Sequence, residues 1–185
     1  MRKAVVFVGM PGAGKSVAAD CATALDIPVL AMGDVVRDEA TRRGLPHAPE
    51  TLGRIMLELR EKFGPSIIAE RCIAKFRQLK SPSVVIDGAR SEAETVSFRK
   101  AVESVVIVAV HASPKVRFER LVKRGRADDA VTWEAFQERD SRELDVGLGR
   151  VIAQADVMLI NEGSTKDLER RVTRLLKDEL GSKQP

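Results

Sequence analysis

The stretch GMPGAGKS, residues 9–16, fits the pattern GxxxxGK[ST] of a phosphate-binding loop. It follows the apolar run Ala4–Val8 and precedes VAADCATAL, a sequence typical of a helix. Glycines permit the backbone conformations in which successive N–H groups turn toward one anion, and a helix start adds its positive end there. We therefore predict a nucleotide site formed by Gly9, Pro11, Gly12, Ala13, Gly14, Lys15, Ser16 and Val17.

The predicted cofactors are ATP and Mg²⁺. Lys15 would reach the β- and γ-phosphates, and the hydroxyl of Ser16 would ligate the metal. Asp87 ends the apolar run Val84–Ile86, at the position where phosphate-loop enzymes carry a second carboxylate near the metal. We predict Asp87 as that carboxylate; a helix cap or turn former is the alternative.

Composition limits the class of protein. With 185 residues, of which 44% are apolar and 31% charged, the chain is long enough for one globular domain. No apolar run is long enough to cross a bilayer, and no signal peptide is visible. Cys21 and Cys72 lack the spacing of a metal site or a disulfide framework, so we expect a cytoplasmic protein. His47 and His111 have no metal-site spacing either, and we interpret them as structural or surface residues.

The net charge of +4 raises the question of nucleic acid as a partner. The chain has no tyrosine and one tryptophan, so it lacks the aromatic residues on which single strands stack. The arginines instead fall in stretches that a phosphate-handling enzyme needs. We expect a small-molecule nucleotide as the partner, with nucleic acid disfavoured and the oligomeric state undetermined.

Short apolar runs alternate with helical patterns along the whole chain. Their order predicts an α/β fold of three layers, in which helices cover both faces of a five-stranded parallel sheet. The ligand of such a sheet lies beyond the carboxyl ends of its strands. The five runs are Ala4–Val8, Val29–Met32, Val84–Ile86, Val105–Val110 and Val157–Ile160.

Two segments exceed what a simple crossover needs. About fifty residues without a strand pattern separate the second and third runs, which predicts a helical insertion over the sheet edge. Its predicted helices are Thr51–Phe63 and one starting at Pro65. The second segment, Lys123–Asp140, is rich in arginine and aspartate. Thr132 and Ser164 are the predicted N-caps of the helices that follow.

Arginines cluster near the predicted strand ends. Guanidinium groups offer a fixed fork of donors, which suits the negative charge that phosphoryl transfer spreads over several oxygens. Any one of them alone is better explained as a solvated surface charge. Together they favour a donor site and an acceptor site, and the set comprises Arg37, Arg90, Arg120, Arg124, Arg126, Arg139 and Arg142.

These stretches resemble the motifs of adenylate kinases. GMPGAGKS is similar to the family's GxPGxGKG/S, MGDVVRDE to TGDLLRxE and IDGARSEAE to DGFPRTxxQ, while RLVKRGRADD matches RxxxRxxxRxDD with the lid nearly deleted. The motifs span most of the chain in the family's order, and the whole chain resembles archaeal adenylate-kinase-related nucleotide kinases. The resemblance implies a nucleoside monophosphate kinase with a core of residues 1–32, 80–120 and 141–185, an acceptor-binding insertion at 33–79 and a short lid at 121–140.

The same resemblance implies roles for individual residues, with AMP as the first candidate acceptor. The acceptor would be bound by Gly33, Asp34, Arg37 and Arg90. The transferred phosphoryl group would be surrounded by Lys15, Arg124, Arg126 and Arg139, and the ATP base would lie near Arg120 and Gly163. Two departures from the family pattern leave the acceptor open, because Met32 replaces a threonine and DGAR is one residue shorter than DGFPR.

Other functions stay open at this point. RGRADDAVTWEAFQERDSRE and ADVMLINEGSTKDLERRV resemble the C-terminal half of dephospho-coenzyme A kinase. That enzyme phosphorylates a ribose hydroxyl, which needs a base, and Asp34 could serve as one. A different class is an ATP-dependent switch or assembly factor with weak hydrolysis, and a third is a sensor that binds AMP without turnover.

Overall fold

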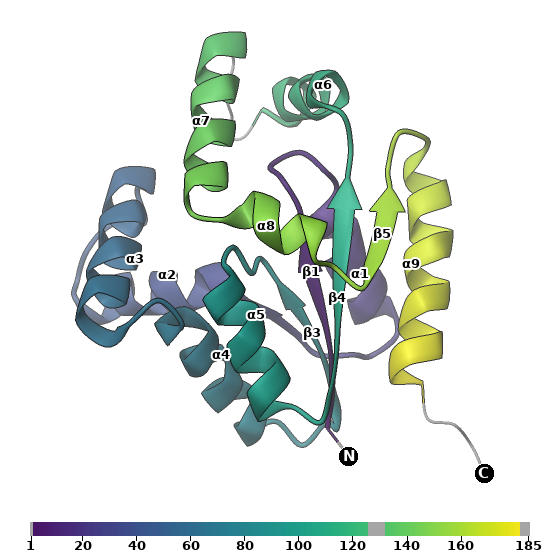
Figure 1. The fold of residues 1–185 in the computed structure, drawn as a ribbon, viewed down its shortest axis with the longest axis horizontal. Coiled ribbons are helices and arrows are strands. Elements are labelled where there is room, and N and C mark those ends of the chain that lie inside the picture. The colour runs from purple at the N-terminus through teal and green to yellow at the C-terminus, as the bar shows by residue number, and fades with distance from the viewer. Residues whose placement is uncertain (1, 126–131, 182–185) are drawn as a thin grey trace.

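A parallel sheet of five strands forms the centre of the fold (Figure 1). The computed structural model describes residues 2–125 and 132–181. The strands lie in the order β2-β3-β1-β4-β5, and every pairing is parallel. The predicted α/β class and the parallel five-stranded sheet are confirmed. The strands are β1 (Lys3–Val8), β2 (Val29–Ala31), β3 (Ser83–Asp87), β4 (Ser104–His111) and β5 (Val157–Ile160).

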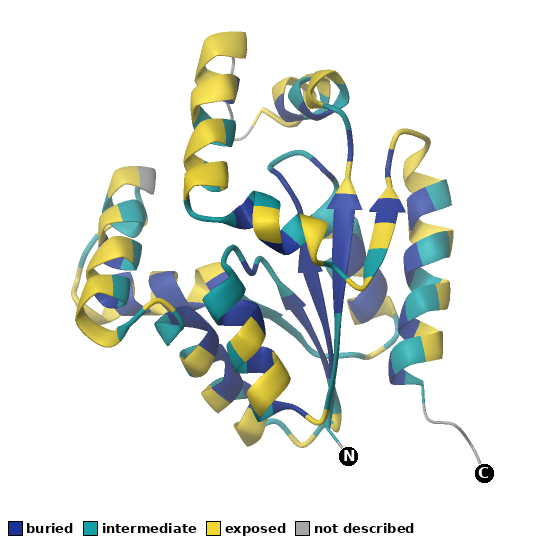
Figure 2. Cartoon of the chain, in the orientation of Figure 1, coloured by how far each residue is buried: buried dark blue, intermediate teal, exposed yellow. Residues whose placement is uncertain are grey.

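Helices cover both faces of this sheet (Figure 1). One core, which contains Val5 and Phe7, lies under α1 (Lys15–Ala24) and α9 (Thr165–Leu180). The other core, which contains Val6 and Ile86, lies on the opposite face of the sheet. Five helices cover it: α2 (Met32–Arg42), α3 (Pro49–Phe63), α4 (Ile67–Gln78), α5 (Glu92–Ala101) and α8 (Leu148–Ala153). Since strand side chains alternate between faces, strands covered on both sides must be apolar throughout. Figure 2 accordingly shows the central strands buried and the helices exposed on one side.

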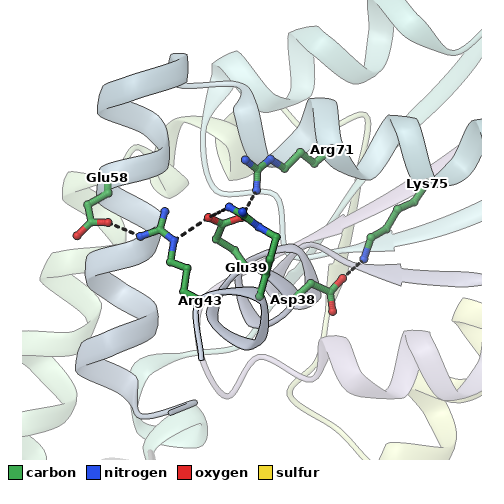
Figure 3. Close-up of polar contacts among 7 residues, drawn as sticks. Asp38, Glu39, Arg43, Glu58, Arg71 and Lys75 are labelled. Carbon is green, nitrogen blue, oxygen red and sulfur yellow. Dashed lines mark hydrogen bonds and ion pairs between the residues drawn. The ribbon is translucent and has the colours of Figure 1, made fainter. Parts of the chain in front are cut away.

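The inserted helices α2, α3 and α4 are joined by a buried carboxylate. Glu39 of α2 is 4% exposed and accepts hydrogen bonds from Arg42 and Arg43 of its own segment and from Arg71 of α4 (Figure 3). Arg43 also donates to Glu58 of α3, at 2.6 Å. These hydrogen bonds, the one from Arg42 first, lower the pKa of Glu39 to about 2 although burial opposes them. The insertion is therefore held together by charge as well as by its apolar contacts.

A second helical pair stands over β4. Helix α6 (Pro114–Arg124) packs against α7 (Trp133–Asp145) through Phe118, Trp133 and Phe136. Ring centroids in this cluster are 5.1 to 5.6 Å apart, the range that favours tilted or offset aromatic pairs. The predicted lid segment 121–140 therefore takes in the end of α6 and most of α7, which continues to Asp145.

The helix starts differ from the predicted ones at some positions. The predicted N-caps are confirmed, since Thr132 accepts from the Ala135 amide and Ser164 from the Asp167 amide, both at 3.2 Å. Met32 does not continue β2 but is the first residue of α2, with Ala31 at the N-cap. Helix α8 was not predicted, because it has only six residues. No helix in the described part of the chain is both long and apolar enough to span a membrane.

Candidate active site

A cleft of about 490 Å³ lies at the carboxyl ends of the strands. Its lining includes the loop after β1, the start of α2, the turn after β3 and residues of α6 and α7, with further residues from α3, α4, α5, α8 and α9. Most of the predicted site residues line it: Gly9, Pro11, Gly12, Gly14, Lys15, Ser16, Val17, Gly33, Arg37, Asp87, Arg90, Arg120, Arg124 and Arg139. The predicted donor and acceptor residues thus share a single cavity.

The loop at residues 9–16 has a backbone that requires glycine. Gly12 has a φ of 80° and Gly14 a φ of 108°, both in the left-handed region. A Cβ on Gly12 would lie 2.7 Å from the carbonyl oxygen of Arg117, and one on Gly14 would lie 2.4 Å from Nδ2 of Asn161. The glycines therefore serve two purposes, the turn itself and the close approach of neighbouring elements.

Asn161, directly after β5, fastens this loop from the side. It is 6% exposed, and its Nδ2 donates to the carbonyl oxygen of Ala13 at 2.8 Å. Ala13 itself is buried and points away from the cleft lining, into the core beneath α1 and α9. A predicted nucleotide contact of Ala13 can therefore involve only its backbone.

Lys15 lies at the floor of the cleft. Its Nζ donates to the carbonyl oxygens of Gly9 at 2.6 Å and Met10 at 3.4 Å. Burial lowers the pKa of Lys15, against the opposing effect of the nearby Asp87 carboxylate. A buried ammonium group whose hydrogen bonds go to neutral carbonyl oxygens binds a phosphate group strongly, since the phosphate supplies both the charge and the acceptor atoms.

The residues present fit a magnesium ion. Burial raises the pKa of Asp87, with Lys15 and Arg90 opposing, and its Oδ1 is buried without a hydrogen-bond partner. The Ser16 hydroxyl lines the same cleft. The described residues contain no group of three or more His, Cys, Asp or Glu that could hold a metal by itself. Mg²⁺ usually binds to one or two protein groups together with substrate phosphates and water, so Ser16 and Asp87 suit it.

Unpaired buried polar atoms gather in this cleft. In the described part of the chain they are Arg60 Nε, Asp87 Oδ1, Arg120 Nη1 and Glu143 Oε2, and all four residues line the cleft. Such atoms are rare in folded proteins, since each costs desolvation energy without a return bond. Their location indicates a site for a strongly polar ligand.

The acceptor side of the cleft combines arginines with an apolar wall. Arg90 is paired with Glu143 of α7 at 3.2 Å between Nε and Oε2, although this contact lacks hydrogen-bond geometry. Arg37 pairs with Asp34, whose Oδ1 accepts from Nε at 3.0 Å. The wall is formed by Met32, Val36, Met56, Ile68 and Ala89. Positive charge suited to an anion and an apolar surface suited to a ring therefore lie side by side in the cleft.

Asp34 does not line the cleft. Its side chain is 53% exposed and ion-paired with Arg37. Helix α2 begins at Met32, and Gly33 and Arg37, four residues apart, line the cleft, whereas Asp34 does not, although it is close enough to Asp87 to help raise the pKa of that carboxyl. Asp34 does not cap α2 either, because Ala31 is the N-cap and Asp34 lies inside the first turn.

Arg60 and Glu94 are cleft residues that sequence reasoning missed. Glu94 of α5 is fully buried, and its Oε1 accepts from Arg60 Nη2 at 2.7 Å. Its Oε2 accepts from the amides of Arg90 at 2.8 Å and Ser91 at 3.2 Å, which closes a capping box. The spacing of Ser91 and Glu94 was the available signal. Glu94 thereby holds the backbone of the arginine predicted to bind the acceptor.

The remaining predicted residues lie on the α6 side. Arg120 Nη2 donates to Asn161 Oδ1 at 3.4 Å and to the Gly163 carbonyl at 3.5 Å, but Gly163 itself does not line the cleft. Arg126 lies outside the described residues. Neither histidine lines the cleft; His47 contacts the Thr41 hydroxyl at 2.9 Å on the surface. Glu143, a further missed residue, lies one helical turn after Arg139.

Comparison with known proteins identifies the family and the fold of the chain. A family model described as an AAA domain matches residues 8–137. The UPF0200 protein of Hyperthermus butylicus is 49% identical over 175 residues, 95% of this chain and 94% of that protein. The crystal structure of TT1252 from Thermus thermophilus superposes with a TM-score of 0.66 at 19% identity, over 96% of this chain and 97% of that one. Shikimate kinase from Aquifex aeolicus gives 0.55 at 16% identity, over 97% and 99%. The structural likeness shows a P-loop kinase-like fold.

Proposed function

The chain belongs to the UPF0200 family, and from its P-loop domain and the geometry of its cleft we propose that it is an ATP-dependent nucleotide kinase. The acceptor is a nucleoside monophosphate, with AMP as the first candidate from the resemblance to adenylate kinases. The observation that carries the proposal is the single cleft that joins the phosphate loop to Arg37 and Arg90. A protein that only bound or hydrolysed ATP would have no need of the second arginine group.

The proposed reaction forms one bond and breaks one. An oxygen of the acceptor phosphate attacks the γ-phosphorus of ATP, and the bond from that phosphorus to the β,γ-bridging oxygen breaks, giving ADP and a nucleoside diphosphate. The acceptor phosphate is already anionic, so the step needs no general base. Catalysis then depends on positioning and on charge stabilisation.

Each group of cleft residues has a part in this reaction. The loop amides and Lys15 bind the donor phosphates, and Arg120 lies where the ATP base is expected. Arg124 and Arg139 stabilise the transferred group, while Arg37 and Arg90 hold the acceptor phosphate. Ser16 and Asp87 would hold Mg²⁺, which neutralises charge on the β- and γ-phosphates. Arg126, beyond the described residues, belongs to the same proposal.

Transfer to a hydroxyl is the second candidate, because one carboxylate of the cleft could act as a base. Asp34 is not that group, since it is paired with Arg37 and lies outside the cleft lining. Glu143 lines the cleft, its Oε2 is ion-paired with Arg90 but accepts no hydrogen bond, and it is close enough to Lys15 to influence the pKa of that amine. A hydroxyl such as that of dephospho-coenzyme A would need such a group to take its proton.

The test is an acceptor panel with Mg-ATP, in which AMP, CMP, UMP and dephospho-coenzyme A are supplied separately and products are separated by chromatography. We expect a diphosphate product with a nucleoside monophosphate, and none with Lys15→Ala. The matched control is Lys115→Ala, since Lys115 is exposed and does not line the cleft. Product from dephospho-coenzyme A alone would support the hydroxyl acceptor. Slow ADP formation with no phosphorylated acceptor would refute the kinase and favour an ATP-dependent switch, and tight AMP binding without turnover would favour a sensor.

A further inference from the structure

A buried arginine links the phosphate loop to α7. Arg117 of α6 is 3% exposed and does not line the cleft. Its Nε donates to the carbonyl oxygen of Ala112 at 3.1 Å, at the end of β4, and its Nη1 donates to the carbonyl oxygen of Pro11 at 3.1 Å. The side chain therefore fixes the loop from behind, on the side away from the ligand.

The same guanidinium contacts α7 from its other edge. Its Nη1 donates to Asp140 Oδ1 at 2.8 Å, and its Nη2 donates to Asp140 Oδ2, which makes a two-point ion pair. The guanidinium carbon also lies 4.9 Å from the ring centroid of Phe136, one turn earlier in α7. Arg117 is 4% exposed in its side chain and Asp140 15%, so solvent screens this pair little.

The geometry of α7 connects this pair to the cleft. Phe136, Asp140 and Glu143 are spaced by four and three residues, so they share the inner face of the helix. Arg139 is adjacent to Asp140, lines the cleft, and is close enough to Lys15 to influence its pKa. Any rotation of α7 that broke the Arg117–Asp140 pair would also move Arg139 relative to the phosphate loop.

We propose that Arg117 and Asp140 are positioning residues that hold Arg139 in register with the phosphate loop before any substrate binds. The expected effect on kcat rests on the proposed phosphotransferase activity, whereas the attachment of α7 to the phosphate loop does not. Charge stabilisation in a transition state works best when the donor is already in place, and a displacement of about 1 Å can cost about 100-fold in rate. The pair thus makes α7 a fixed part of the donor site.

The first experiment separates positioning from ATP binding. In Asp140→Asn, Arg117 keeps its bonds to Pro11 and Ala112 but loses its charged partner on α7. We expect kcat to fall about 10- to 100-fold while the Kd of ATP changes less than about twofold. The matched control is Asp156→Asn, which removes a carboxylate paired with Arg99 at 2.7 Å far from the cleft, and it leaves both values within about twofold. In Arg117→Met, which also releases Pro11, both kcat and ATP affinity fall.

A double-mutant cycle distinguishes positioning from general destabilisation. In an Arg139→Ala background, Asp140→Asn has nothing left to position, so we expect no further loss of kcat beyond about twofold, whereas its effect on Tm stays the same. An equal fractional loss of kcat in both backgrounds would overturn the proposal. So would an unchanged kcat in Asp140→Asn with wild-type sequence elsewhere.

Hydrogen exchange tests the tether without any acceptor. Amides of residues 133–145 should exchange about tenfold faster or more in Asp140→Asn than in the wild type, and at wild-type rates in Asp156→Asn. If no acceptor is phosphorylated, the kinase proposal fails while faster exchange in this helix still supports the tether. Unchanged exchange there would overturn the tether even if the protein is an active kinase.

Discussion

The Glu39 network makes a quantitative prediction for stability. Replacing Glu39 by Gln keeps the size of the side chain but removes the negative charge that Arg42, Arg43 and Arg71 share (Figure 3). These cations belong to α2, to α4 and to the turn between α2 and α3, so removing the charge weakens contacts between several parts of the insertion. Because the carboxylate is almost fully buried, solvent does not replace the lost bonds.

The size of the effect follows from the pKa of Glu39. A fall from the ordinary value of 4.5 to about 2 corresponds to about 3 kcal/mol of folding free energy at neutral pH. The depressed pKa means that this stability is fully present above pH 4.5 and is lost as the pH falls toward 2. For a domain of this size, about 3 kcal/mol lowers Tm by about 6–12 °C.

Thermal unfolding followed by circular dichroism between pH 3 and pH 6 measures both quantities. The difference between wild type and Glu39→Gln should shrink by about 2 kcal/mol from pH 6 to pH 3. The control is Glu58→Gln, which removes a 45%-exposed carboxylate from the same network and should cost less than about 1 kcal/mol. A loss below about 1 kcal/mol in Glu39→Gln, or a difference independent of pH, would refute the assignment.

Three further predictions concern the cleft. Glu143→Gln frees Arg90 from its ion pair, so steady-state kinetics should show a severalfold fall in the KM of a monophosphate acceptor with kcat retained. A large loss of kcat would instead identify Glu143 as the base for a hydroxyl acceptor. Gly14→Ala places a Cβ 2.4 Å from Asn161 Nδ2 at a φ of 108°, so calorimetry should detect no ATP binding while the far-ultraviolet spectrum is unchanged. Arg60→Met leaves the buried carboxylate of Glu94 in α5 without its cation. We expect kinetics to show a raised acceptor KM and thermal unfolding to show a Tm loss equivalent to about 3–5 kcal/mol. A variant with only one of these effects would contradict a role of Arg60 in both the cleft and the stability of the fold.

Local sequence patterns were sufficient to predict the main elements. Each apolar run became a strand because it was bounded by turn residues and flanked by helical stripes, and the sheet is parallel because helices separate all five. The order of the strands in the sheet and the presence of α8 could not be predicted from these patterns. Order depends on which crossover packs on which face, and a six-residue helix such as α8 is too short to show a period.

For the candidate site, sequence reasoning found what motifs encode and missed what packing encodes. The phosphate loop and Arg90 could be predicted because each belongs to a short sequence motif whose residues are also close together in space. Arg60 and Glu94 lie 34 residues apart, and only the packing of α3 against the rest of the fold brings them together. Asp34 differs, since the resemblance of MGDVVRDE to TGDLLRxE assigned it to the acceptor together with Gly33, whereas a helix turns successive side chains by about 100° and Asp34 does not line the cleft.

The insertion separates its network of ion pairs from the residues that line the cleft. The residues joined in Figure 3 do not line the cleft, whereas Met32, Val36, Met56 and Ile68 on the same helices do. Substitutions on the cleft side leave the ion pairs of Figure 3 intact, but Met32, Val36 and Ile68 also belong to the buried core. Under the proposed function, a change of acceptor can therefore keep the charged network of the insertion, but it must repack the apolar core beside the cleft.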